Sequence, residues 1–225
     1  MPLESQGVQI RRQSTTAGST AQTIAATVAF SAAATSITRS DLGSFVTDGF
    51  STGMRVENNS TVNSTRVHTI ATVAATVMTT YEPIVAQTTG ISITITGHSM
   101  QAVAQITGYT GPQISCSKLD TTDLSSTAKT FIPSLRDSGD VSLDIVFGSE
   151  ATALHSALRS DLETRTKRVY DIVLTDQTTV AGSQPSAFYF DGYITNFSLS
   201  GSVDNIIKGN VTIAISSAVR TIDRI

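Results

Sequence analysis

The hydrophobic period changes once between residues 137 and 162, and this change constrains the fold more than any other feature of the sequence. In residues 141–147, apolar side chains alternate with Ser142 and Asp144, and a period of two is typical of a strand buried on one face. Leucines then recur at every fourth position over residues 154–162, which predicts one amphipathic helix of about three to four turns. Ser149 lies between the two elements and is placed to cap the helix.

The segment in front of the predicted strand is expected to be a loop and a turn. Residues 120–123 are Asp and Thr, which form turns and caps because their side chains bond nearby backbone groups. We therefore expect a long polar loop over residues 121–140. A tight turn at residues 137–140 ends it, and there Gly139 is available for a positive backbone angle.

Other short alternating segments predict a chain that is mainly β. Further strands are expected near residues 6–12, 169–174, 187–199 and 206–216. The strand pattern also continues over residues 98–118, where Gly111-Pro112 is expected to make a turn. Gly192, inside one of these strands, indicates a bulge or a close approach of the backbone.

Residues 22–97 form a second region that is rich in Thr, Ala and Val. Turn clusters separate its short alternating segments, and short strands at regular spacing are typical of a small β barrel or sandwich. We interpret this region as an inserted β module. The remaining domain then comprises residues 1–21 and 98–225.

The composition excludes some classes of function. At 225 residues, the chain can form one domain or two and can bury a substantial core. Charged residues make up 15% and the formal net charge is −3, without the basic excess of a protein that grips nucleic-acid phosphates tightly. Cys116 is the single cysteine, which excludes an intrachain disulfide, and we expect a buried, inert thiol.

No targeting signal is evident from the sequence. Residues 1–12 lack the apolar core of a signal peptide. Residues 13–38 are uncharged but contain too many Ser, Thr and Gln residues to span a bilayer. We therefore expect an intracellular protein with no membrane address.

No pattern of catalytic or metal-ligating residues emerges. Residues 97–101 begin like a nucleophile elbow but lack its closing glycine, so we expect a loop there. His68, His98 and His155 are far apart in sequence, and no pair has the spacing of metal ligands. We expect His155 to be packed or solvated on the helix. The sequence thus predicts a protein without catalytic, cofactor-binding or metal-binding residues.

The residues around the expected loop form a recognisable pattern: Asp120-Thr121-Thr122, Ser126, Lys129-Thr130-Phe131-Ile132-Pro133, Leu135, Asp137 and Gly139-Asp140-Val141. This pattern resembles the signature loop of a known family, the tail tube proteins of long-tailed bacteriophages. Residues 188–217 are similar to that family's closing strand pair, and residues 101–117 to its lead-in, so the resemblance covers roughly the C-terminal half of the chain. Ser134 departs from the Gly that commonly follows the proline in this family.

The resemblance implies a mainly β fold, a tail-tube-type β sandwich or barrel with one flanking α-helix. Subunits would form hexameric rings that stack into a hollow tube, through which DNA passes to the host. The partners would be further copies of the chain, other tail proteins at the tube ends, and viral DNA in the lumen without specific binding. The protein would be located in the virion tail, after assembly in the host cytoplasm.

Two sets of site residues are expected within this framework. A free subunit gains little from a polar loop with exposed apolar residues, so we expect this loop to order at a subunit interface. A wet channel suits strands with one polar side, so we expect such faces to line the lumen. The interface set is Lys129, Phe131, Pro133, Asp137 and Gly139, and the lumen set is Ser142, Asp144, Asn210 and Thr212.

Several alternatives remain open at this point. The chain could be a head-to-tail joining protein or a tail-tip protein that forms a single ring. It could also be a carbohydrate-binding or hydrolytic tail accessory, although the sequence shows no aromatic or paired-carboxylate cleft for that role. Residues 36–56 resemble a small β module of other phage structural proteins, and the alternative is a long, decorated hairpin of the tube fold itself.

Overall fold

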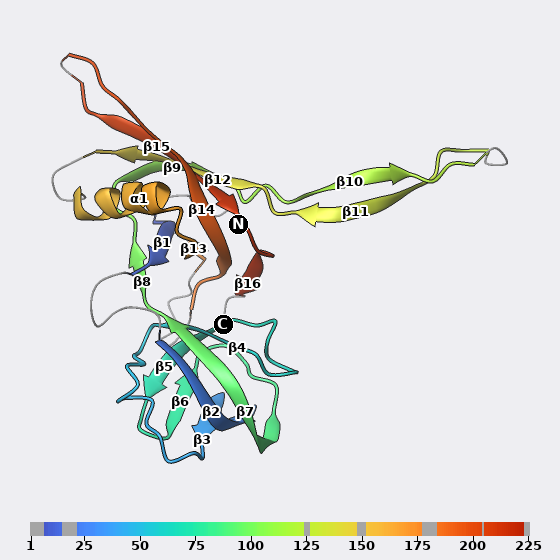
Figure 1. Cartoon of the computed structure of the whole chain (residues 1–225), viewed down its shortest axis with the longest axis vertical. Helices are drawn as coiled ribbons and strands as arrows, with labels where there is room; N and C mark the ends of the chain where they lie inside the picture. The colour runs from blue at the N-terminus through green and yellow to red at the C-terminus, as the bar shows by residue number, and fades with distance from the viewer. Residues whose placement is uncertain are drawn as a thin grey trace. The chain divides into compact units, whose positions relative to one another are not determined.

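The computed structural model describes residues 7–14, 22–123, 127–147, 152–176, 184–203 and 205–222. Strands dominate these residues and form a closed barrel and an open sheet, beside one helix (Figure 1). The predicted fold class, mainly β with one helix, is confirmed. The chain divides into two compact units, of which the first comprises residues 1–103, 168–190 and 220–225 and the second residues 104–167 and 191–219. The predicted helix cap at Ser149 lies outside the described residues.

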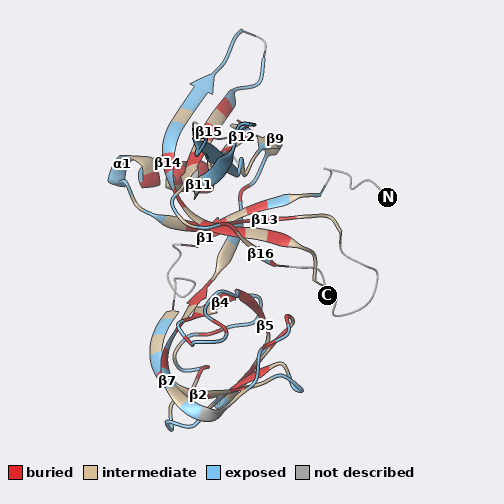
Figure 2. Cartoon of the chain, turned by 90° about the vertical axis from the view of Figure 1, so that its right-hand side faces the viewer, coloured by how far each residue is buried: buried red, intermediate tan, exposed pale blue. Residues whose placement is uncertain are grey.

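A closed six-stranded barrel forms most of the first unit (Figure 2). Its strand order is β2-β3-β6-β5-β4-β7. Apolar side chains from every strand meet inside, and Phe45 and Phe50 close the core in an edge-to-face contact with ring centroids 5.7 Å apart. The expected small barrel is thus present. The strands are β2 (Gln22–Ser31), β3 (Ser36–Arg39), β4 (Arg55–Asn58), β5 (His68–Val73), β6 (Val77–Thr80) and β7 (Gln87–His98).

The first unit also contains a small antiparallel sheet. Its order is β8-β1-β13-β14, and β16 pairs with the start of β14. Val67 of the barrel segment packs into the apolar cluster of this sheet with Val169, Tyr189 and Ile222. The strands are β1 (Gln9–Gln13), β8 (Met100–Ala102), β13 (Arg168–Val173), β14 (Ala187–Ser200) and β16 (Arg220–Ile222).

The second unit is built on the later part of β14, followed by β15 (Lys208–Ile215), β12 (Asp140–Val146) and β9 (Ile106–Thr110). β12 and β15 pair antiparallel, with Leu143 opposite Val211. Both side chains are fully buried. On each strand, the neighbours of these two residues, Ser142 and Asp144 on β12 and Asn210 and Thr212 on β15, are partly or fully exposed. The alternation read from the sequence is therefore a sheet with one apolar and one polar face.

The helix α1 (Thr152–Thr164) contributes Leu154, Leu158 and His155 to the core of the second unit. These residues recur at positions i, i+1 and i+4, on one side of the helix. The His155 ring lies on Phe147, with centroids 5.2 Å apart, and its Nε2 lies 3.4 Å from the Ala104 carbonyl oxygen. The expectation that His155 is packed on the helix holds.

Gly192 lies where two backbones approach closely. A Cβ added there would lie 2.7 Å from Ile213 Cγ2 and 2.9 Å from the Ala214 carbonyl oxygen. The register of β14 shifts between Ile194 and Asn196, and Gly192 itself pairs in register with Ile215. Of the two alternatives predicted for Gly192, the close approach is correct, and the bulge lies further along β14, between Ile194 and Asn196.

A two-stranded hairpin, which we call the arm, projects from the second unit (Figure 1). It consists of β10 (Ser115–Asp120) and β11 (Phe131–Asp137), so the loop expected over 121–140 is wrong for its second half. The sequence did not predict β11, because nearly all of its residues are exposed and apolar and polar side chains do not alternate along it. Gly139, between β11 and β12, has the predicted positive φ of 64°.

One further prediction in this region is wrong. Cys116 lies on the arm and is exposed rather than buried, because the arm has no second layer to cover it. Residues 98–118, where the strand pattern is expected, contribute to β8, β9 and β10. One break between these strands is at Gln105, with a positive φ of 58°, and another is at Gly111–Pro112, where the sequence predicts a turn.

Candidate functional site

The polar face of the second unit collects all four residues expected at a lumen. Ser142 pairs with Thr212, and Asp144 pairs with Asn210, on neighbouring strands. The Asn210 amide donates to Ser142 Oγ at 3.0 Å and to Asp144 Oδ1 at 2.9 Å. Asp144 is exposed, so this face presents a fixed carboxylate within a row of uncharged polar groups.

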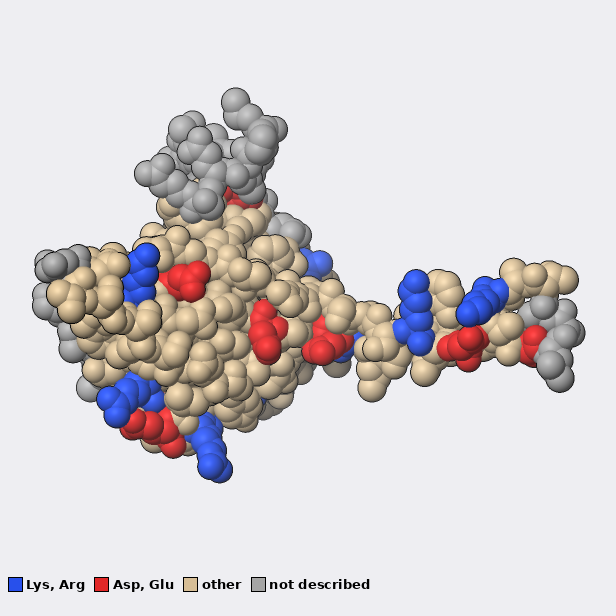
Figure 3. All heavy atoms as spheres, turned by 90° about the horizontal axis from the view of Figure 1, so that it is seen from above, with Lys and Arg blue, Asp and Glu red and all other residues tan. Residues whose placement is uncertain are grey.

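The arm carries most of the residues expected at a subunit interface. Phe131, Pro133 and Asp137 lie on β11, and Lys129 lies in the connection before it; all four are exposed. Lys118 of β10 places its Nζ 4.5 Å from the centre of the Phe131 ring. Along the arm, basic and acidic side chains lie side by side (Figure 3).

Gly139 differs from the other four residues, because contacts within its own subunit account for a glycine at this position. A Cβ at this position would lie 2.4 Å from the Gln113 carbonyl oxygen, and its φ is in the left-handed region. Its N–H donates to Asp137 Oδ1 at 2.9 Å. Gly139 therefore shapes the junction between the arm and β12.

A buried cluster of charges in the first unit was not predicted from the sequence. The Asp171 carboxylate on β13 is fully buried and accepts hydrogen bonds from two guanidinium groups. Arg11 Nε donates to Oδ1 at 2.8 Å and Arg11 Nη2 donates to Oδ2, while Arg55 Nε donates to Oδ2 at 3.0 Å. Arg55 comes from the barrel strand β4 and Arg11 from β1, so the carboxylate joins the barrel to the sheet.

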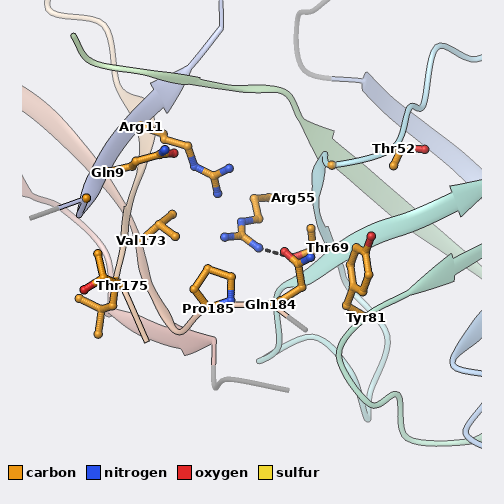
Figure 4. A pocket seen from close by; sticks show the side chains of 13 residues that line it. Gln9, Arg11, Thr52, Arg55, Thr69, Tyr81, Val173, Thr175, Gln184 and Pro185 are labelled. Atoms are coloured by element: carbon orange, nitrogen blue, oxygen red, sulfur yellow. Dashed lines mark hydrogen bonds between the residues drawn. The ribbon is translucent and has the colours of Figure 1, made fainter. Parts of the chain in front are cut away.

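A cleft of about 470 Å³ lies beside this cluster (Figure 4). Arg55 also donates through Nη1 to Thr69 Oγ1, and the Thr69 backbone N–H and hydroxyl both donate to the Glu82 carboxylate. Two cations thus face two anions, which leaves no net charge to attract an ion. We call this network of Arg11, Arg55, Asp171, Thr69 and Glu82 the clamp, because it connects the barrel to the sheet, and we interpret the cleft as its edge.

A second carboxylate, Glu57, makes a similar connection two residues further along β4. Its Oε2 accepts from Arg220 Nη2 at 2.6 Å, and its Oε1 lies 2.9 Å from His98 Nε2 and accepts from Tyr189 Oη at 3.3 Å. Burial alone would raise the pKa of Glu57. The hydrogen bonds from His98 and Arg220 and the charges of both groups outweigh it, so the pKa is lowered to about 2.

Two signals in the sequence could have revealed this clamp. In β4, Arg55 and Glu57 alternate with the apolar Val56, so both charged side chains leave the strand on the side opposite the barrel core. In β13, Asp171 is a lone charge between apolar residues in a buried strand. A buried charge needs a partner, but a single sequence does not say which one.

The Thr69 hydroxyl bonds to the Glu82 carboxylate, but both side chains are buried. The described residues hold no group of three side chains suited to a metal ion. No helix in the described part of the chain is long and apolar enough to cross a membrane. The features that stand out are instead an exposed arm and a sheet with a continuous polar face.

A family model described as "Phage tail tube, TTP, lambda-like" matches residues 82–224, which is more than half of the chain. The chain belongs to this family, and it is therefore a structural protein of the phage tail, located in the tail of the virion. The match includes β7 and all later strands, and the earlier strands of the barrel precede it.

Among solved structures, one similar chain is from the "Cryo-EM structure of the anti-feeding prophage (AFP) baseplate, 6-fold symmetrised". The two chains share 9% identity with a TM-score of 0.43, over 56% of this chain and 84% of the other. No curated protein matches the chain.

The Glu57 contacts predict a specific loss of stability in acid. Because the folded pKa of about 2 lies below the ordinary value of 4.5, the stabilisation is present above pH 4.5 and is lost as the pH falls toward 2. We expect this loss to be about 1–3 kcal/mol, reduced from its maximum by the partial exposure of the side chain. Urea unfolding of the unassembled subunit between pH 6 and pH 2.5 measures it.

The variant Glu57→Gln should be less stable at pH 6 and show a flatter decline in acid. Glu163→Gln is the matched control, since Glu163 is exposed and its partner is the exposed Arg159, one helical turn away. If Glu57→Gln and the wild type lost stability with the same slope, the pKa of Glu57 would not be coupled to folding.

Proposed function

We propose that this protein is the subunit of a hollow tail tube, in which hexameric rings stack and through which DNA is delivered to the host. The family match supports a role in the tail tube. The exposed arm is the observation that supports assembly through contacts between subunits. Other tail proteins bind at the tube ends, and the subunit is made in the host cytoplasm. It acts without catalysis, without a cofactor or metal, and away from membranes.

The arm lacks sufficient support within its own subunit. An isolated two-stranded hairpin is at best marginally stable in water, and further strands or a helix are needed to stabilise it. Nearly every residue of β10 and β11 is exposed, including Phe131 at 55% and Leu135 at 91%. Lys129, Phe131, Pro133 and Asp137 are therefore proposed as contacts with a neighbouring subunit, with Gly139 setting the direction of the arm.

The variant Phe131→Ala tests this interface. Because Phe131 is exposed in the subunit, we expect the free energy of unfolding of the monomer to change by less than about 0.5 kcal/mol. Assembly should be weakened by about 3–5 kcal/mol, because the ring is buried in the tube. Thermal melts of monomer and tube, with electron microscopy of tube length, separate the two effects.

Leu42→Ala is the matched control, since Leu42 is a fully exposed apolar residue in a barrel loop. If Phe131→Ala formed tubes of normal length and thermal stability, the proposal that the arm lies at the subunit interface would be wrong.

The polar face with Ser142, Asp144, Asn210 and Thr212 is proposed to line the lumen. Its support is chemical: the polar groups bond to one another, and a carboxylate repels phosphates. Such a surface would let DNA pass without binding it. The opposite face of the same strands is apolar and packs inside the subunit.

Reversing the charge at Asp144 tests this placement. Asp144→Lys should slow DNA ejection because each ring then presents cations to the phosphates, and Asp144→Asn should have a smaller effect. Tube formation should remain intact in both, since Asp144 is exposed and its carboxylate bonds to Asn210 of the same subunit. The rate of DNA ejection from purified virions is measured with a DNA-binding dye. Equal rates for the wild type and both variants would show that this face does not line the lumen.

Residues 22–97 are proposed as a module on the outside of the tube, inserted into a domain of residues 1–21 and 98–225. The barrel is closed and has its own core, and most of it precedes the family match. Gln22 pairs directly with Gly97, so the two ends of the module are adjacent. A short linker can therefore replace it with a small entropic cost.

Replacing residues 22–97 with a Gly/Ser linker should leave a soluble subunit that forms tubes of the same bore and a smaller outer diameter. The subunit should be less stable, because Asp171 loses Arg55 and Arg220 loses Glu57. Electron microscopy measures both diameters. A subunit that stays monomeric and folded would instead assign the barrel to the tube wall or to ring stacking.

The alternative is a head-to-tail joining or tail-tip protein that forms one ring. Its arm and polar face would serve the same contacts, but growth would stop after the first ring. Negative-stain images of the purified protein distinguish long tubes from single rings.

A further inference from the structure

The arm joins its sheet through two short chain segments that come into backbone contact. β9 pairs with β12 as far as Thr110, and β10 pairs with β11 from Ser115 onward. Residues 111–114 and 138–139 lie between these two pairings and form the base of the arm. The direction of the arm therefore depends on the conformation of these two segments.

Each segment of the base contains a glycine that lies directly against the backbone of the opposite strand. A Cβ at Gly111 would overlap the Asp140 carbonyl oxygen and lie 3.1 Å from Val141 Cα. A Cβ at Gly139 would overlap the Gln113 carbonyl oxygen in the same way. The two glycines also have positive φ angles, of 109° and 64°, which residues with a side chain rarely adopt. The two segments thus cross more closely than a side chain at either position allows.

The end of β15 binds the base of the arm through two hydrogen bonds. The Ile215 N–H donates to the Gly139 carbonyl oxygen at 3.1 Å. Ser138 Oγ donates to the Ser217 carbonyl oxygen at 3.0 Å, and Ser138 is buried. The crossing is therefore attached to the strand that neighbours β12 in the sheet, as well as to its own two strands.

The segment that binds the base is itself fixed to the sheet. The Ser216 N–H donates to the Asp191 carbonyl oxygen at 2.8 Å, and the Asp191 N–H donates to Ser217 Oγ at 2.9 Å. Further along the same segment, the Val219 carbonyl oxygen accepts from Arg136 Nη2 of the arm at 3.3 Å. We call the crossing of the two glycines and these hydrogen bonds the lock.

We propose that the lock fixes the direction of the arm in the free subunit, before a neighbouring copy binds. Beyond the lock, the strands of the arm are exposed, so they stay open to contact along their length. An element that already has its bound direction loses less conformational entropy on binding than a swinging one, so the lock makes assembly more favourable without adding a contact. This consequence for assembly rests on the proposed function, whereas the fixed direction is a property of the subunit alone.

A hinge at the same place is the alternative. Hinges are short segments that absorb large changes of backbone angle, and small residues are common in them. At the base of the arm, however, each glycine is in contact with the opposite backbone, and Ser138 between the arm and Gly139 is bonded to β15 and its continuation. These contacts would have to break before the arm could swing, which favours the lock.

Spin-label distances in the monomer test the lock. In a Cys116→Ser background, Leu119→Cys places one label on the exposed arm and Ser198→Cys places the other on an exposed position of the sheet. We expect a narrow distance distribution by pulsed electron paramagnetic resonance. Gly139→Ala should at least double its width, because the added Cβ does not fit the crossing.

Gly201→Ala is the matched control, since a Cβ at Gly201 would have no neighbour nearer than 3.5 Å. It should leave the width unchanged. A distribution that is as broad without Gly139→Ala as with it would show a hinge and overturn the proposal.

A second variant covers the case in which Gly139→Ala does not fold. Arg136→Gln combined with Ser138→Ala removes both side-chain donors of the lock and adds no atom at the crossing. The distribution should broaden again, by less than in Gly139→Ala, and Ser202→Ala at an exposed serine is the control. An unchanged width in the folded double variant would contradict the lock.

Assembly is measured separately on unlabelled protein. The double variant should raise the protein concentration needed for tube formation about tenfold, because the loosened arm must then be ordered on binding. A normal assembly concentration together with a broadened arm would exclude a role of the lock in assembly. Wild-type protein that never forms tubes would refute the tube function and leave the fixed direction of the arm standing.

Discussion

The buried carboxylate of Asp171 is the interaction on which the first unit depends. A buried charge costs several kcal/mol unless it is paired and hydrogen-bonded, and Asp171 lies between Tyr170 and Ile172, which are also fully buried. Its partners come from two different parts of the unit, one from β1 and one from the barrel. Removing one partner of such a cluster typically costs about 3–5 kcal/mol. The barrel and the sheet therefore stabilise each other through a group that neither can satisfy as well alone.

The strand β4 links the barrel to the sheet, because one side of the strand packs in the barrel core and the other side forms ion pairs with the sheet. Val56 faces the barrel core, while Arg55 and Glu57 leave the strand on the other side and contact β13, β14 and β16. Bonds between guanidinium groups and carboxylates are directional, so these contacts fix an orientation as well as a distance. The barrel is therefore held in a fixed orientation against the sheet strands of its own unit.

The sequence predicted the elements in which burial alternates. β12, β14, β15 and α1 were found because their apolar residues recur at a clear period, and the polar residues Ser142, Asp144, Asn210 and Thr212 fall on one face for the same reason. The arm was missed as a hairpin because exposed strands have no such period, and Pro133 argues against a strand. The pairing of Arg55 with Asp171 spans 116 residues, and no local pattern encodes a partner at that distance.

The two faces of the second unit depend on a single register. β12 and β15 pair without interruption from Asp140 opposite Ala214 to Val146 opposite Lys208. A slip of one residue would move every side chain to the other face, placing Asp144 in the core and Leu143 in solvent. The irregularities lie instead in the neighbouring pairings, between Asp144 and Ile145 opposite β9 and between Ile194 and Asn196 in β14. Because the register changes fall in the neighbouring pairings, the central pair keeps the polar row and the apolar face of the sheet apart.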